Sequence, residues 1–143
     1  SLGGLVAAFC ACDLSEVKAA ILWEAPFNLV RNLRRMYGPL SITKIKERGY
    51  WQTGMMKLNP RFMEQFDNLT ASDLRPRLNI PLLFIQGDVD EIVTVDDARE
   101  WQSTFNDHGG FEIHYIEGGD HTFTQEEHAL QAINLTSDWI LNL

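Results

Sequence analysis

Three short apolar segments, separated by helical segments, constrain most strongly what this chain can fold into. The apolar segments contain β-branched and aromatic side chains, as strands do, and span residues 17–25, 80–86 and 111–117. Helical patterns lie before, between and after them, at residues 3–13, 95–106 and 125–141. Because parallel strands are joined by such crossover segments, the chain is predicted to form an α/β fold with a doubly wound, mostly parallel sheet.

The regular alternation stops between residues 26 and 78. This stretch holds short amphipathic pieces with several aromatic and methionine side chains, and it is too apolar for a disordered linker. We therefore interpret residues 1–143 as part of one domain that carries an insertion at about 26–78.

The charge and hydropathy of the chain argue against two classes of partner. The formal net charge is −8, whereas a nucleic-acid-binding domain presents a basic surface. The apolar run at 80–85 is far shorter than the roughly 20 residues of a membrane helix. We expect neither a nucleic-acid nor a membrane partner, and make no prediction of oligomeric state. A cytoplasmic location is favoured, but secretion stays open because a signal would lie upstream of Ser1.

The two cysteines, Cys10 and Cys12, lie two positions apart in the first predicted helix. Side chains at this spacing point to different faces, so the pair is not arranged for a disulfide or a shared metal ion. We interpret both as small buried side chains.

Serine, aspartate and histidine follow one another along the chain at positions suited to nucleophilic catalysis. Ser1 opens the first helix, Asp88 and Asp90 follow the second strand, and His121 follows the third. The carboxyl ends of parallel strands meet at one edge of a sheet, where sites form. A serine hydroxyl needs a histidine to take its proton and a carboxylate to orient that histidine.

The four histidines differ in their predicted positions. His121 lies in a glycine-rich loop after a strand, whereas His114 lies within that strand and His108 and His128 lie in or beside helices. We therefore select His121 as the base and interpret the other three as solvent-facing or core residues. Asp120, adjacent to His121, is expected to shape the loop.

The segments Ser1-Leu2-Gly3-Gly4, Gly87-Asp88-Val89-Asp90 and Gly119-Asp120-His121 together resemble α/β-hydrolases, in which the triad has the order Ser, Asp, His. Residues 81–90, 116–123 and 134–139 further resemble bacterial cinnamoyl (feruloyl) esterases and related peptidase-like hydrolases.

The resemblance implies a partial α/β-hydrolase fold that starts at the nucleophile, with the N-terminal strands missing. It selects Asp90 over Asp88 as the acid and gives the Leu2 backbone N–H to the oxyanion hole. Gly3 and Gly4 are expected to let the first helix approach the sheet closely. Neither a metal ion nor an organic cofactor is implied.

The resemblance also implies that the insertion is a lid subdomain that contacts the acyl part of an ester. The candidate pocket residues are Tyr50, Trp51, Met55, Met56, Phe62 and Phe66. Packing of the same side chains into the lid's own core is an equally good interpretation.

The predicted function is a serine carboxylic-ester hydrolase acting on small-molecule esters, either aromatic (cinnamoyl or feruloyl) or short acyl. Three alternatives stay open. One is a serine peptidase or amidase of the same fold, and another is an N-terminal-nucleophile hydrolase, which would need a strand rather than a helix at Ser1. The third is a non-catalytic fragment that keeps these residues without a formed site.

Overall fold

The computed structural model describes residues 1–38, 43, 47–53, 56–59, 61, 64–65 and 70–143. The chain divides into two compact units, one made of Ser1–Phe27 with Ala71–Leu143 and the other of Asn28–Thr70. The second unit falls within the predicted insertion at 26–78. Residues 71–78 of that stretch lie in the first unit instead, where Ala71, Leu74 and Leu78 are fully buried.

The first unit is built on a three-stranded parallel sheet. Its strands are β1 (Ala20–Trp23), β4 (Leu82–Gly87) and β5 (Phe111–Ile116), in the spatial order β1-β4-β5. The central strand β4 pairs with both neighbours, and every residue in it is buried. This confirms the predicted α/β class with a parallel sheet, although β1 is shorter than the segment 17–25.

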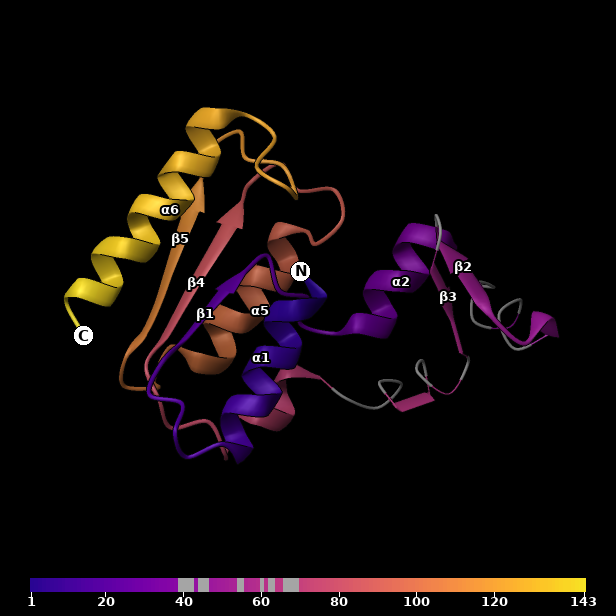
Figure 1. The fold of residues 1–143 in the computed structure, drawn as a ribbon, viewed down its shortest axis with the longest axis horizontal. Coiled ribbons are helices and arrows are strands. Elements are labelled where there is room, and N and C mark those ends of the chain that lie inside the picture. The colour runs from indigo at the N-terminus through magenta and orange to yellow at the C-terminus, as the bar shows by residue number, and fades with distance from the viewer. Residues whose placement is uncertain (39–42, 44–46, 54–55, 60, 62–63, 66–69) are drawn as a thin grey trace. The chain divides into compact units, whose positions relative to one another are not determined.

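Helices cover both faces of the sheet (Figure 1). Helix α6 (Glu126–Leu141) lies on one face, and α1 (Leu2–Asp13) and α5 (Val95–Phe105) lie on the other. A short 3-10 helix, η1 (Ala71–Leu74), precedes β4. The layers have the helix–sheet–helix arrangement that a doubly wound sheet requires.

Alternating strand residues supply the two halves of the core. Leu83 and Ile85 of β4 face α6 and pack with Ile116, Phe123 and Ala132. Phe84, which lies between them in sequence, faces the other side, where its ring centroid is 5.6 Å from that of Trp101 in α5. The period of two thus gives each sheet face its own apolar layer.

Helix α1 packs against β1 through a glycine. A Cβ atom at Gly4 would lie 3.0 Å from the Cβ of Ala25, whereas Gly3 has nothing within 4 Å. Gly4 therefore permits the close approach predicted for both glycines.

The same helix corrects the expectation for the cysteines. Leu5, Ala8 and Ala11 form the buried face of α1, at spacings of three. Cys10 falls on the outward side and is exposed, and Cys12 is half-buried. Both are free thiols, but neither is a fully buried core residue.

The second unit contains a helix and a hairpin among its described residues. Helix α2 (Leu29–Tyr37) is capped by Asn28, whose side-chain oxygen accepts a hydrogen bond from the Arg31 N–H at 2.8 Å. Strands β2 (Trp51–Thr53) and β3 (Met56–Leu58) pair antiparallel.

Among the described residues of both units, no helix is long and apolar enough to cross a membrane.

Candidate active site

Three loops at the carboxyl ends of the strands bring one histidine and two carboxyl groups together. His121 lies in the β5–α6 loop, Asp90 in the β4–α5 loop, and Glu24 directly after β1. The Nδ1 atom of His121 is 2.7 Å from Oδ2 of Asp90 and 3.7 Å from Oε2 of Glu24. The strand order thus places these side chains at one edge of the sheet, as the sequence predicts for Asp90 and His121.

The Asp90 carboxylate is held in place by backbone donors. Its Oδ1 atom accepts hydrogen bonds from the N–H groups of Ile92 and Val93, at 2.7 and 2.8 Å. Gln86 approaches the other oxygen, Oδ2, at 3.4 Å, and only 4% of Asp90 is exposed. These bonds fix the orientation of the Asp90 carboxylate and point Oδ2 at Nδ1 of His121.

Two glycines allow the loops that carry Asp90 and His121 to touch. A Cβ atom at Gly87 would lie 2.2 Å from the carbonyl oxygen of Gly119. The N–H of Val89 donates a hydrogen bond to that same oxygen at 3.2 Å. The end of β4 and the loop after β5 therefore approach more closely than any residue with a side chain would allow.

Two further acidic residues nearby, Asp88 and Asp120, hold the loops. Oδ1 of Asp88 accepts the Gly118 N–H at 2.7 Å, which ties the β4–α5 loop to the β5–α6 loop. The Asp120 carboxylate accepts bonds from the backbone of Thr122 and from both the backbone and hydroxyl of Thr124. The Thr124 bonds lower the pKa of Asp120. Asp120 thus has the loop-shaping contacts expected of it.

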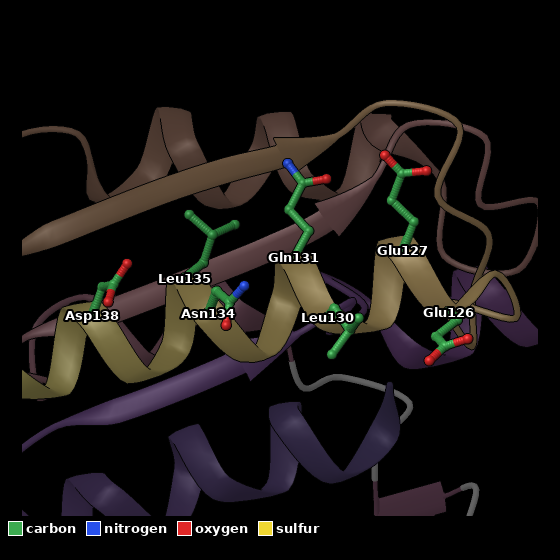
Figure 2. A pocket seen from close by; sticks show the side chains of 7 residues that line it. All are labelled: Glu126, Glu127, Leu130, Gln131, Asn134, Leu135 and Asp138. Carbon is green, nitrogen blue, oxygen red and sulfur yellow. The ribbon is translucent and has the colours of Figure 1, made fainter.

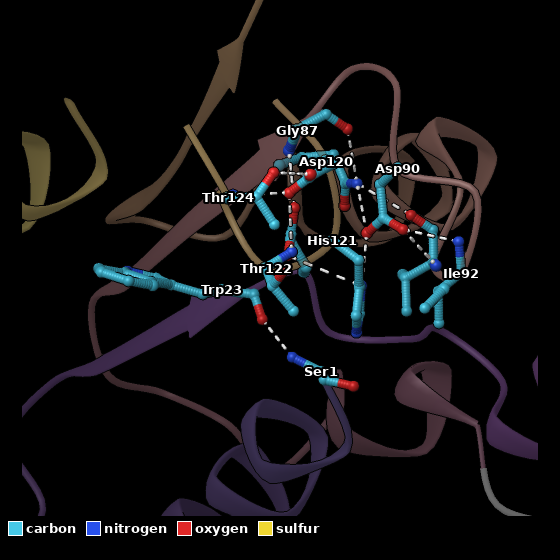
Figure 3. Close-up of polar contacts among 12 residues, drawn as sticks. Ser1, Trp23, Gly87, Asp90, Ile92, Asp120, His121, Thr122 and Thr124 are labelled. Atoms are coloured by element: carbon cyan, nitrogen blue, oxygen red, sulfur yellow. Dashed lines mark hydrogen bonds and ion pairs between the residues drawn. The ribbon is translucent and has the colours of Figure 1, made fainter. Parts of the chain in front are cut away.

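Ser1 lies at the start of α1, close to this cluster (Figure 3). Its amino group donates a hydrogen bond to the carbonyl oxygen of Trp23, the last residue of β1. Leu2 is the first residue of the helix, where a backbone N–H has no acceptor within the helix.

The remaining histidines lie elsewhere in the fold. His108 is buried, and its Nε2 atom is 2.5 Å from the carbonyl oxygen of Leu78. His114 pairs with Glu112 on the surface of β5, at 2.6 Å. His128 is half-buried in α6. None of the three touches Asp90 in the described structure.

Glu24 is the residue that the sequence reasoning missed. It is 2% exposed, and burial raises its pKa to about 7, with the charge of Asp90 adding to the rise. The strand β1 ends at Trp23, so Glu24 falls just after a strand, as Asp90 and His121 do. The sequence pattern gives no sign of this, because it predicts an apolar segment that runs through Glu24 to residue 25.

The three side chains also offer one ligand atom each within 4.8 Å of one another. However, Nδ1 of His121 lies at hydrogen-bonding distance from Asp90, and that carboxylate already accepts two backbone N–H groups. We interpret the cluster as a proton-transfer group, since each of these contacts orients a proton or a donor.

Hollows border the site on the surface of the first unit. One, of about 460 Å³, is bordered by His121 and by residues of the two loops, namely Val89, Glu91, Ile92, Asp120 and Thr122. Another, of about 390 Å³, lies beside Asp88 and Asp90. A further hollow, of about 640 Å³, is lined only by residues of α6 (Figure 2). Of these three, the first borders His121.

The structure describes only some of the predicted lid residues. Tyr50 is 40% exposed, with the Lys57 ammonium 4.8 Å from its ring centroid. Trp51 and Met56 lie in strands β2 and β3. Met55, Phe62 and Phe66 lie outside the described residues.

Comparison with protein families finds no family model that matches this chain, and no curated protein matches it.

Solved structures, in contrast, match nearly the whole chain. The esterase domain of a Rhodothermus marinus protein has a TM-score of 0.72 at 17% identity, over 96% of this chain and 57% of its own. Est1E from Butyrivibrio proteoclasticus, with ferulic acid bound, has a TM-score of 0.73 at 18% identity, over 99% and 56%. Mouse alpha/beta hydrolase domain-containing protein 10 has a TM-score of 0.71 at 18% identity, over 99% and 60%.

These matches show that the chain has a partial α/β-hydrolase fold. It spans less than two thirds of each of the three structures. The predicted relationship to α/β-hydrolases is thereby confirmed at the level of the fold.

Proposed function

We propose that this chain carries the catalytic residues of a serine hydrolase that cleaves carboxylic esters. Ser1 is the nucleophile, His121 the general base and Asp90 the acid that orients it. The observation that carries the proposal is the 2.7 Å contact between His121 Nδ1 and a buried, backbone-bonded Asp90, formed beside the start of α1.

The proposed reaction is a two-step acyl transfer. The Ser1 hydroxyl oxygen attacks the ester carbonyl carbon while His121 Nε2 takes the hydroxyl proton. The bond to the alcohol then breaks, and His121 gives the proton to the departing oxygen. Water, activated by the same histidine, releases the acid and restores the serine. Asp90 stabilises the imidazolium that forms in each step.

The oxyanion hole would use the Leu2 backbone N–H at the first position of α1. The helix N-terminus carries partial positive charge, which favours the negative oxygen of a tetrahedral intermediate. Each such donor typically contributes about 10²- to 10³-fold in rate.

The substrates we propose are small-molecule esters, with aromatic (cinnamoyl or feruloyl) acyl groups as the first class to test. The similarity to Est1E, which was solved with ferulic acid bound, supports this class. We propose Tyr50, Trp51, Met55 and Met56 as acyl-binding residues of a lid. A Trp51→Ala variant should then alter the preference between acetyl and cinnamoyl esters, and equal losses on both would argue against that role.

Labelling with a fluorophosphonate, followed by mass spectrometry to map the modified residue, tests the proposal. We expect modification at Ser1 that is lost in both Ser1→Ala and His121→Ala. Labelling of Ser1 that persists in His121→Ala would reject the base assignment. A chain that does not label at all would not be a self-sufficient hydrolase.

A serine peptidase or amidase of the same fold would label in the same way. Turnover of matched ester and peptide substrates separates the two, because only the leaving group differs. Faster turnover of the peptide substrate would favour a peptidase over an esterase.

A further inference from the structure

Glu24 occupies an unusual backbone position at the end of β1. Its φ angle is +50°, in the left-handed region that residues with side chains seldom adopt. Its N–H still donates to the carbonyl oxygen of Ile85 at 2.8 Å, so the strand pairing holds this conformation in place. A backbone of this kind is strained, and such strain gathers at functional sites.

The Glu24 side chain reaches the same imidazole nitrogen as Asp90. One carboxyl oxygen, Oε2, lies 3.7 Å from His121 Nδ1, and the other, Oε1, accepts the Gly87 N–H at 3.3 Å. Nδ1 carries at most one proton, and the 2.7 Å contact indicates that this N–H donates to Asp90. Glu24 therefore stands as a second carboxyl beside an already paired imidazole.

The two carboxyl groups accept different hydrogen bonds from the backbone. Asp90 accepts two short backbone bonds on one oxygen, whereas Glu24 accepts one long bond from Gly87. Burial, followed by the charge of Asp90, raises the pKa of Glu24 to about 7. The charge of His121 and the hydrogen bond from Gly87 act in the opposite direction.

We propose that Glu24 is a second positioning carboxyl for the His121 imidazole, acting beside Asp90 at the same ring nitrogen. The inference rests on the proposed function, in which His121 is the base. Glu24 would be partly ionised at neutral pH and would gain negative charge when His121 becomes positive, because a nearby cation favours the carboxylate. The imidazolium would then be stabilised by two carboxylates.

The charged side chains that face Glu24 in the described structure come from two loops. They are Asp90 from the β4–α5 loop and His121 from the β5–α6 loop. Each can be replaced separately, and each replacement should shift the pKa of Glu24 in a known direction.

The test is a carboxyl-carbon NMR titration of the 143-residue chain labelled at glutamate, with Glu24→Gln used to assign the signal. We expect Glu24 to titrate near pH 7. Asp90→Asn should lower that midpoint by about one pH unit or more, since it removes a like charge, and His121→Ala should raise it. Asp88→Asn, whose carboxylate bonds to Gly118 instead, is the matched control and should leave it unchanged.

The ring signals of His121 give a second readout that a purely structural glutamate would not move. When two groups are coupled, the signals of one shift as the other titrates. The His121 ring signals should therefore shift at the pH where Glu24 titrates, and this shift should be absent in Glu24→Gln. A Glu24 midpoint that moves in neither Asp90→Asn nor His121→Ala would overturn the inference. So would His121 ring signals that are the same in the parent and in Glu24→Gln.

These outcomes separate the inference from the proposed function. If Glu24 and His121 titrate together but Ser1 is not labelled by a fluorophosphonate, the inference about Glu24 holds and the chain is not a self-sufficient hydrolase. If Ser1 is labelled but Glu24 titrates independently of His121, the proposed function holds and the inference about Glu24 is wrong.

Discussion

The Asp90 carboxylate lies 2.7 Å from Nδ1 of His121, although 31 residues separate them in the chain. The two side chains come from loops that follow adjacent parallel strands, β4 and β5, whose carboxyl ends point the same way. Their meeting therefore follows from the sheet topology, and its fine geometry follows from the bonds that hold each loop.

If the proposed function holds, replacing Asp90 should slow catalysis far more than replacing Asp88. Asp90→Asn keeps the shape but loses the charge and the Nδ1 acceptor, which in a triad costs up to about 10⁴-fold in rate. Asp88→Asn should change the rate only a few-fold, because Asp88 bonds to Gly118 and not to His121. The rate of fluorophosphonate labelling at Ser1 measures both. The reverse ranking would transfer the acid role to Asp88.

Adding one methyl group at Gly87 should disrupt the fold. The new Cβ atom would lie 2.2 Å from the Gly119 carbonyl oxygen, which is backbone and cannot turn aside. We expect Gly87→Ala to lower the free energy of unfolding by about 3 kcal/mol. Gly109→Ala is the matched control, since Gly109 has nothing within 4 Å. Urea denaturation gives both values, and equal stabilities would contradict the close approach.

The two glycines of α1 should respond differently to alanine. Gly3→Ala should raise the free energy of unfolding by about 0.5–1 kcal/mol, because alanine favours a helix and nothing crowds that position. Gly4→Ala should lack this gain, since its Cβ would lie 3.0 Å from that of Ala25. Thermal unfolding followed by circular dichroism compares them. A gain at both positions would mean that α1 is free to move away from β1.

Glu24 should make the protein less stable as the pH rises. Its pKa is raised from 4.5 to about 7 in the folded state, so between these values the folded state binds more protons than the unfolded one. Its contribution is fully present below about pH 4.5 and is lost as the pH rises through about 7. At ~1.4 kcal/mol per pH unit, the loss is roughly 3 kcal/mol.

Glu24→Gln should remove this pH dependence. The difference in unfolding free energy between the parent and the variant, measured by urea denaturation at pH 5 and pH 8, isolates it from other groups. We expect the free energy of unfolding of the variant, relative to that of the parent, to be higher at pH 8 than at pH 5. An equal difference at both pH values would argue that Glu24 titrates in its ordinary range.

The order of helices and strands, and the edge of the sheet where the candidate site lies, follow from the pattern of residues along the chain. Apolar segments with period-two packing fix the strands, and parallel crossovers place the residues after each strand together. This reasoning brought Asp90 and His121 to one place and put Ser1 at a helix start, because these placements depend only on local pattern and topology.

How closely the loops approach, and which carboxyl oxygens reach the imidazole, depend on contacts that form only in the folded protein. Asp90 is singled out over Asp88 by the N–H groups of Ile92 and Val93, and the loops touch only because Gly87 and Gly119 leave room. The buried Glu24 likewise depends on a backbone turn that no local pattern indicates. Hydrogen bonds and burial change over a few tenths of an ångström, a scale that the order of residues along the chain does not set.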